Sequence, residues 1–125
     1  MKYLFTLAIG FSITALAAPS TLPSVAHGNV EVSDVLTITS HSERAVLNWK
    51  DYSIDAKEVA QFNLPSSDAA ILNRVTGHES SLILGTLQSN GQVFLINPCG
   101  VIFGPNAIVN TRACRQLSKI TAPAK

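Results

Sequence analysis

The central part of the chain consists of short apolar runs separated by single residues that favour turns. Residues 35–39, Val-Leu-Thr-Ile-Thr, alternate apolar and polar side chains, which is the period of a β-strand with one exposed face. Similar runs predict strands at 45–49, 52–54, 61–64, 81–84, 92–97, 101–103 and 107–110. The turn residues between the later runs are Gly77, Gly85, Asn90-Gly91, Pro98, Gly100, Gly104 and Pro105. The pattern predicts an all-β fold, with one short helical candidate at 66–73.

These corners are too short for a sandwich built from hairpins. Asn90-Gly91 suits a type I′ hairpin between Leu87 and Gln92, but the other gaps hold single Gly, Pro or Asn residues. Short strands joined by such corners favour a coil of stacked rungs. In such a coil an asparagine at a corner either bridges to the next rung through its amide or simply tolerates a left-handed turn. The candidates are Asn73, Asn97, Asn106 and Asn110.

The first residues have the features of a secretory signal peptide. Lys2 precedes an apolar segment at 3–16, and no further formally charged residue occurs before Glu31. This segment is shorter than the 18 or more residues of a membrane-spanning helix, although an uncleaved anchor is the alternative. Small residues predict cleavage after Ala17 or after Ala26.

Composition limits both the size and the partners of the folded part. The 125 residues contain 46% hydrophobic and 14% charged side chains, which indicates one folded domain rather than a disordered chain. The formal charge of +1 excludes the basic surplus of a nucleic-acid binder. Residues 18–111 carry four bases and eight acids, whereas residues 112–125 carry four bases and no acid. The tail is either a basic arm for an anionic partner or, as we favour, a segment that does not belong to the domain.

The side chains that could act in catalysis or bind a metal are far apart in the sequence. His27, His41 and His78 have no paired spacing, so no metal site and no cofactor are expected. The eight acids lie singly, and none falls between Gly85 and Thr111, which argues against an enzyme. Cys99 and Cys114 either form a disulfide or stay unpaired, and Trp49 is either a core residue or a platform for stacking sugars.

Four segments carry a family resemblance. Residues 72–77 (Leu-Asn-Arg-Val-Thr-Gly) and 85–104, which contain Asn-Pro-Cys-Gly, are the longest, and 44–49 and 59–65 match earlier strands. Together they resemble the filamentous haemagglutinin family, in particular the amino-terminal secretion domain of two-partner-secretion exoproteins of Gram-negative bacteria. The resemblance covers about two-thirds of the chain, from Gly28 to Thr111.

The resemblance implies a right-handed parallel β-helix, incomplete and of few rungs, that follows a helical signal peptide. We expect a signal peptide at 1–26, a partial secretion domain at 27–111 and a divergent basic tail at 112–125. Such a domain is not an enzyme. It passes through the Sec machinery and signal peptidase, is recognised in the periplasm by an outer-membrane transporter, nucleates β-helix folding and reaches the cell surface. The alternative is a secreted carbohydrate-active or carbohydrate-binding β-helix protein.

The resemblance also assigns residues. Asn97, Pro98, Cys99 and Gly100 form the expected secretion motif, in which Cys99 replaces the family's second asparagine. A second signature, expected to be structural, comprises Asn73, Arg74, Gly77, Asn90 and Gly91. After Thr111 the sequence departs from the family, so we expect a truncated or frameshifted member. A host-cell or surface target is then expected only through a passenger that these residues lack.

Overall fold

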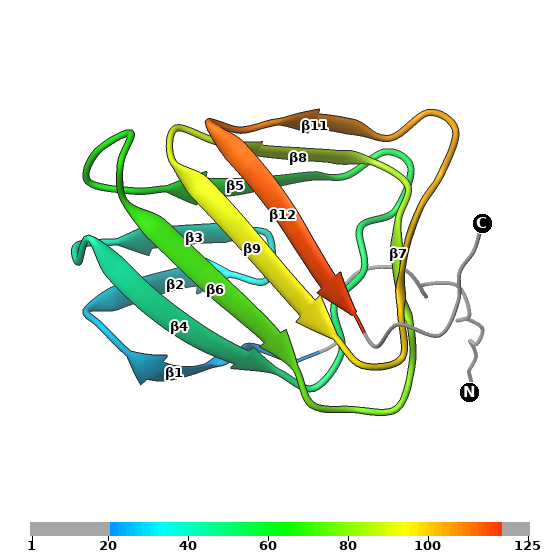
Figure 1. The fold of residues 1–125 in the computed structure, drawn as a ribbon, viewed down its shortest axis with the longest axis horizontal. Helices are drawn as coiled ribbons and strands as arrows, with labels where there is room; N and C mark the ends of the chain where they lie inside the picture. Colours follow the sequence, from blue (N-terminus) through cyan, green and yellow to red (C-terminus); the bar gives the residue numbers. More distant parts are fainter. Residues whose placement is uncertain (1–20, 119–125) are drawn as a thin grey trace, which may run out of the picture.

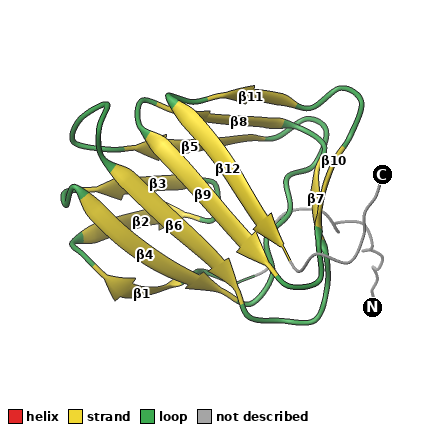
Figure 2. Ribbon diagram, viewed as in Figure 1, coloured by secondary structure: helices red, strands yellow, loops and turns green. Residues whose placement is uncertain are grey.

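The computed structural model describes the backbone of residues 21–118 and the side chains of residues 21–113. Within this part the chain forms strands and turns, without a helix (Figure 2). The strands are β1 (Ser24–His27), β2 (Val30–Asp34), β3 (Thr37–Ser40), β4 (Arg44–Trp49), β5 (Val59–Asn63), β6 (Ala70–Val75), β7 (Ser81–Ile83), β8 (Thr86–Ser89), β9 (Gln92–Asn97), β10 (Val101–Phe103), β11 (Ile108–Asn110) and β12 (Ala113–Ser118).

The strands wind into a coil with three faces (Figure 1). One face is a five-stranded sheet in the order β1-β4-β6-β9-β12, and a second is a five-stranded sheet in the order β11-β8-β5-β3-β2. The third face is the short pair β7 and β10, preceded by a single bridge between Ile54 and Ile83. Successive turns therefore run β3-β4, β5-β6-β7, β8-β9-β10 and β11-β12, which confirms the right-handed parallel β-helix.

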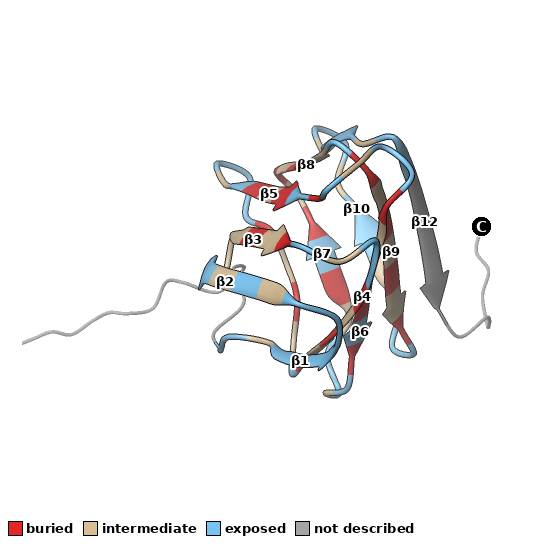
Figure 3. Cartoon of the chain, turned by 90° about the vertical axis from the view of Figure 1, so that its left-hand side faces the viewer, coloured by how far each residue is buried: buried red, intermediate tan, exposed pale blue. Residues whose placement is uncertain are grey.

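The turns stack in parallel register. Arg44 pairs with Ala70, and Ala70 pairs with Gln92, so one turn takes 26 residues and the next takes 22. Buried and less buried residues alternate along β4, β6 and β9, as Figure 3 shows by colour. This alternation is the period-2 pattern of strands with one face against a core.

The core is the inside of the coil. Its fully buried side chains come from all three faces, and the largest are Trp49, Phe62, Ile38, Leu47, Ile54, Ile71, Ile83, Leu87 and Val93. Trp49 is therefore a core residue, not an exposed platform for sugars. Its ring packs edge-on against Tyr52, with 4.7 Å between the ring centroids.

The first turn is covered by two antiparallel strands. β1 pairs with β4 and β2 pairs with β3, whereas the other strand pairs are parallel. Because β1 begins at Ser24, this cap starts before the expected domain boundary at residue 27. The cap occupies edges of the first turn that would otherwise expose unpaired backbone groups.

Most of the expected strands are confirmed, but two local predictions are wrong. Residues 66–73 are not helical, because a turn at 66–69 leads into β6. Asn90-Gly91 is not a hairpin turn, because β8 and β9 belong to different sheets. Of the expected strand at 52–54, only the bridge at Ile54 forms.

The expected signal-peptide segment up to residue 20 lies outside the described residues. Between residues 21 and 118, no helix is long and apolar enough to span a membrane. At the other end the winding continues past Thr111, since β12 pairs with β9 over six Cα positions.

Candidate functional site

The Asn97-Pro98-Cys99-Gly100 turn carries the chain from the first sheet to the β7–β10 face. Asn97 is buried, and its Nδ2 donates to the Glu79 carbonyl at 2.9 Å and to Ser81 Oγ at 3.0 Å. Its Oδ1 accepts a hydrogen bond from the Cys99 amide at 2.9 Å, and its carbonyl accepts one from the Gly100 amide at 2.9 Å. One side chain thus shapes the turn and ties it to the preceding coil.

Gly100 completes this turn in a backbone conformation that favours glycine. Its φ is +108°, which side chains with a Cβ rarely adopt, although the space beside its Cα is open. The Gly100 carbonyl accepts a hydrogen bond from the Ser81 amide at 2.9 Å, which starts the parallel pairing of β10 with β7.

Cys99 is exposed and its thiol is free. The turn forms with cysteine in place of the family's second asparagine, because the hydrogen bond to Asn97 Oδ1 comes from the backbone amide of Cys99 and not from its side chain. A disulfide with Cys114 does not fit the register, because Cys114 pairs with Val93. Cys114 thus lies beside Val93, whereas Cys99 follows Asn97 at the far end of the same strand. Val93 and Asn97 are four residues apart, about 13 Å along a strand, whereas the two Cα atoms of a disulfide lie within about 7 Å of each other.

Asn73 connects three consecutive turns inside the coil. It lies in the middle of β6, not at a corner as expected, and is 1% exposed. Its Oδ1 accepts a hydrogen bond from Trp49 Nε1 on β4 at 2.9 Å, and its Nδ2 donates to the Phe94 carbonyl on β9 at 3.2 Å. The buried indole N–H of Trp49 and the buried side-chain amide of Asn73 therefore both have hydrogen-bond partners on neighbouring strands.

Arg74 and Gly77 have different surroundings. Arg74 points outward from the same strand, where its Nε donates to Asn48 Oδ1 at 3.0 Å. Gly77 follows the strand at a point where an added Cβ would collide with the Lys50 carbonyl oxygen. This corner therefore requires a residue without a Cβ at position 77.

Asn90 and Gly91 tie another corner to the turn before it. Asn90 accepts a hydrogen bond from the Leu64 amide at 2.8 Å and donates one to the Leu64 carbonyl at 2.7 Å. Gly91 is buried, and a Cβ there would come within 2.6 Å of a Leu64 methyl carbon. The pair therefore forms a stacked corner between two sheets.

The structure does not gather these residues into one pocket. Asn73, Asn90 and Asn97 act at separate places, each joining one turn of the coil to another, whereas Asn106 and Asn110 are exposed. Sequence reasoning missed the partners Trp49, Leu64 and Ser81, because each lies 16 to 26 residues away from the asparagine it contacts. The signal that could have found Trp49 is its spacing of about one coil turn from Asn73.

The side chains that could bind a metal ion do not cluster in the described part of the coil. Among residues 21–113, no three His, Cys, Asp or Glu side chains lie together in a way that could hold a metal ion. The described residues form a stack of turns that asparagine side chains join by hydrogen bonds. Such a stack can present strands and surfaces to a partner and can serve as a base for further turns.

Comparisons with known proteins agree with this architecture. The model of the TPS (two-partner secretion) secretion domain matches residues 16–114. Two heme/hemopexin-binding proteins of Haemophilus influenzae are 40% identical over 78 residues and 34% identical over 90 residues. These matches cover 62% and 70% of this chain but only 8% and 10% of the two relatives.

A solved structure gives the same result for the fold. The crystal structure of the HMW1 secretion domain from Haemophilus influenzae superposes with a TM-score of 0.68 at 37% identity. It covers 81% of this chain and 27% of the HMW1 chain. The relatives named here are thus two binding proteins and a secretion domain. The match to more than half of the chain, together with the shared coil, shows that the chain belongs to the family of two-partner-secretion (TPS) secretion domains.

Proposed function

We propose that this chain directs the export of a longer exoprotein across the outer membrane to the cell surface. In this proposal it crosses the inner membrane through the Sec machinery, and soluble periplasmic domains of a partner outer-membrane transporter recognise it. Once outside, its coil nucleates the folding of the turns that follow. Stacking of each new turn on a folded one then favours outward movement, because each addition is downhill in free energy.

The observation that carries this proposal is a difference, within residues 21–118, between the first turn of the coil and the last. β1 and β2 cover the first turn, whereas β10, β11 and β12 are edge strands among the described residues. Phe103 pairs with the buried Ile83 and Val109 pairs with the buried Leu87, yet Phe103 is 38% and Val109 40% exposed. This end supports the stacking of a further turn.

The cap also bears on the cleavage of the signal peptide. We propose cleavage after Ala17, because cleavage after Ala26 would remove three of the four residues of β1, which pairs with β4. Mass spectrometry of the exported chain distinguishes the two sites. A chain that begins at residue 27 would contradict the proposed role of β1.

Export itself is tested by co-expression with the cognate transporter. We expect the chain in the culture medium when the transporter is present and in the periplasm when it is absent. Asn97→Ala should lower the released fraction, because it removes the side-chain bonds to Glu79, Ser81 and Cys99.

The matched control is Asn110→Ala, which changes an exposed asparagine on β11. It should leave release unchanged. Retention of the wild-type chain in the periplasm beside an active transporter would contradict the proposed function.

A further inference from the structure

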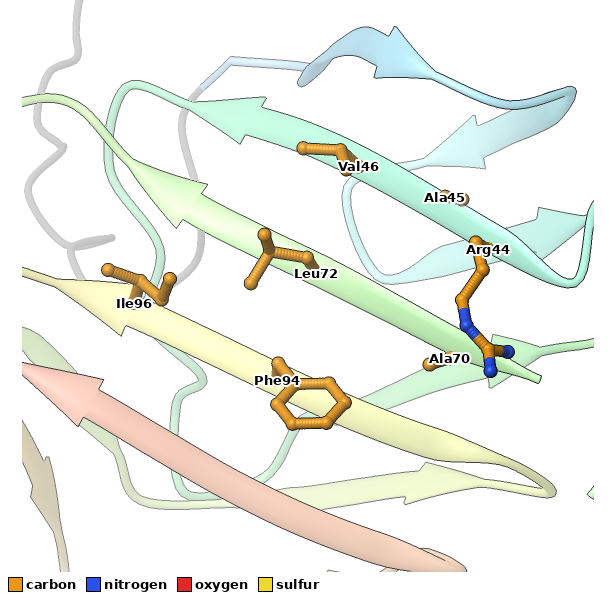
Figure 4. A pocket seen from close by; sticks show the side chains of 7 residues that line it. All are labelled: Arg44, Ala45, Val46, Ala70, Leu72, Phe94 and Ile96. Atoms are coloured by element: carbon orange, nitrogen blue, oxygen red, sulfur yellow. The ribbon is translucent and has the colours of Figure 1, made fainter. Parts of the chain in front are cut away.

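Reactive groups are absent from the hollow on the outer face of β4, β6 and β9. This hollow of about 410 Å³ is lined mainly by apolar side chains such as Leu72 and Phe94, with Arg44 at its edge (Figure 4). None of the side chains that line it is a nucleophile or a carboxylate, so the hollow supplies no group for a reaction. The corner between β8 and β9, at Asn90-Gly91, is different in this respect.

Asn90-Gly91 is the only Asn-Gly pair in the sequence. Asparagine is a chemically labile residue, because the backbone nitrogen of the following residue can attack its side-chain amide carbon. Glycine hinders this attack least, since it has no Cβ and leaves the backbone free to rotate. Every other asparagine of the chain precedes a residue with a Cβ. In the unfolded chain, Asn90 is therefore the asparagine most open to this reaction.

The reaction needs water and no other reagent. The Gly91 nitrogen loses its proton to solvent and bonds to Asn90 Cγ, while the bond from Cγ to Nδ2 breaks and the nitrogen leaves as ammonia. Water then opens the resulting succinimide ring. Cleavage of the new bond to Cγ leaves aspartate at position 90, whereas cleavage of the original peptide bond leaves isoaspartate. No atom is oxidised or reduced.

The fold holds both reacting groups in other hydrogen bonds. Asn90 Oδ1 accepts from the Leu64 amide at 2.8 Å, and Nδ2 donates to the Leu64 carbonyl at 2.7 Å. The Gly91 amide donates to Ser89 Oγ at 3.0 Å, and its carbonyl accepts from the Arg112 amide at 3.0 Å. Asn90 is exposed, so water reaches it. What the fold prevents is rotation of the side chain into line with the Gly91 nitrogen.

Both products of the reaction disturb the same corner. Aspartate keeps an acceptor for the Leu64 amide but loses the donor to the Leu64 carbonyl, so two oxygens face each other without a hydrogen. Isoaspartate adds a carbon to the main chain beside Gly91, which is buried and where even a Cβ would come within 2.6 Å of a Leu64 methyl carbon. Either change weakens the tie between the turn that contains β8 and the turn that contains β5.

We propose that Asn90-Gly91 is a deamidation site of the unfolded chain, that the folded coil protects it, and that deamidation there hinders later folding. A chain that stays unfolded becomes modified at this corner, whereas a chain that has formed its coil keeps the corner intact. The inference concerns the chain itself and does not depend on the export route.

The first test compares deamidation in the folded chain and in the chain unfolded by guanidinium chloride, at the same slightly alkaline pH. Protease digestion and mass spectrometry follow the conversion of the peptide that contains Asn90. A synthetic peptide of residues 86–95, measured in both solutions, corrects for the effect of the denaturant on the chemistry. We expect the reaction to be at least about tenfold slower in the folded chain, because both bonds to Leu64 must break first. A smaller difference would overturn the inference.

A second Asn-Gly pair at an exposed position gives the matched control. Thr111→Gly places glycine after Asn110, which is exposed on β11, an edge strand among the described residues. In the folded variant, whose fold circular dichroism checks, Asn110 should deamidate faster than Asn90. A rate at Asn110 no faster than the rate at Asn90 would overturn the protective role of the Leu64 bonds.

The last test concerns the product. Asn90→Asp carries one product from the start and should have a lower urea midpoint than the wild type, and failure to fold would support the inference equally. Asn110→Asp adds the same charge at an exposed position and should leave the midpoint unchanged. After refolding of a partly deamidated sample, the modified chain should be depleted from the folded fraction. A wild-type midpoint for Asn90→Asp, or equal amounts of modified chain in the folded and unfolded fractions, would overturn the inference.

Discussion

Replacing Asn73 with leucine should destabilise the coil more than any exposed substitution. The change removes the hydrogen bonds to Trp49 Nε1 and to the Phe94 carbonyl, each worth about 1 kcal/mol net. It also leaves the buried indole N–H without its acceptor, at a cost of about 1–3 kcal/mol. Leucine recovers part of this by burying apolar surface, so we expect a net loss of about 2–4 kcal/mol.

That loss is large against the stability of a domain of this size, which is typically about 5–15 kcal/mol. Urea unfolding followed by far-UV circular dichroism measures it, and the midpoint should fall by about 1–2 M. Asn110→Leu, at an exposed position on β11, is the control and should change stability by less than about 0.5 kcal/mol.

A double-mutant cycle isolates the bond itself. Trp49→Phe removes the N–H donor, so Asn73→Leu should cost about 1–2 kcal/mol less in that background than in the wild type. If Asn73→Leu leaves stability within about 0.5 kcal/mol of the wild type, or if the two substitutions are additive, the reasoning about the buried bridge is refuted.

Two further predictions concern the corners. Gly77→Ala should lower the urea midpoint more than Gly100→Ala, because a Cβ at Gly77 collides with the Lys50 carbonyl whereas Gly100 has open space and only backbone strain, worth about 1–3 kcal/mol. Equal effects would contradict the close approach. Cys99→Ser should leave stability within about 0.5 kcal/mol, and the Cys99 thiol, followed in a Cys114→Ser background, should react at once with a thiol reagent in the folded protein. A thiol that reacts only after unfolding would contradict its exposure.

Much of the fold was predictable because its strands have strong local patterns. β4, β9 and β10 coincide with runs that alternate or are densely apolar, and the short corners between them indicated stacked turns. The strands β1 and β2 were missed by sequence reasoning, although β2 (Val-Glu-Val-Ser-Asp) does alternate apolar and polar side chains. They form because the first turn offers them backbone partners, and no local sequence feature reports those partners.

The wrong predictions share a physical cause. Asn90-Gly91 has the residues of a tight hairpin, but its conformation is decided by the hydrogen bonds between Asn90 and Leu64, a residue 26 positions earlier. Residues 66–73 have a composition that permits a helix, yet Ala70 pairs with both Arg44 and Gln92 in a sheet. Contacts across one turn of the coil outweigh local preference in both cases.

The hydrogen bonds of the motif residues were predictable only in part. Of the two roles expected for a corner asparagine, Asn97 has the bridging one, although it bridges to the preceding turn and not to the next. Asn73 also bridges turns, but from inside a strand and through an indole that the sequence did not connect to it. The charge change at Arg112 did not mark the end of the winding, since backbone pairing in β12 continues to Ser118.

The most direct test of the parallel coil is the set of nuclear Overhauser contacts between strands in the exported chain. The structure predicts contacts in register from Leu47 to Asn73 and from Asn73 to Leu95, which join segments separated by 26 and 22 residues. Contacts that instead join β8 to β9 as an antiparallel hairpin across Asn90-Gly91 would contradict the coil and the export role built on it.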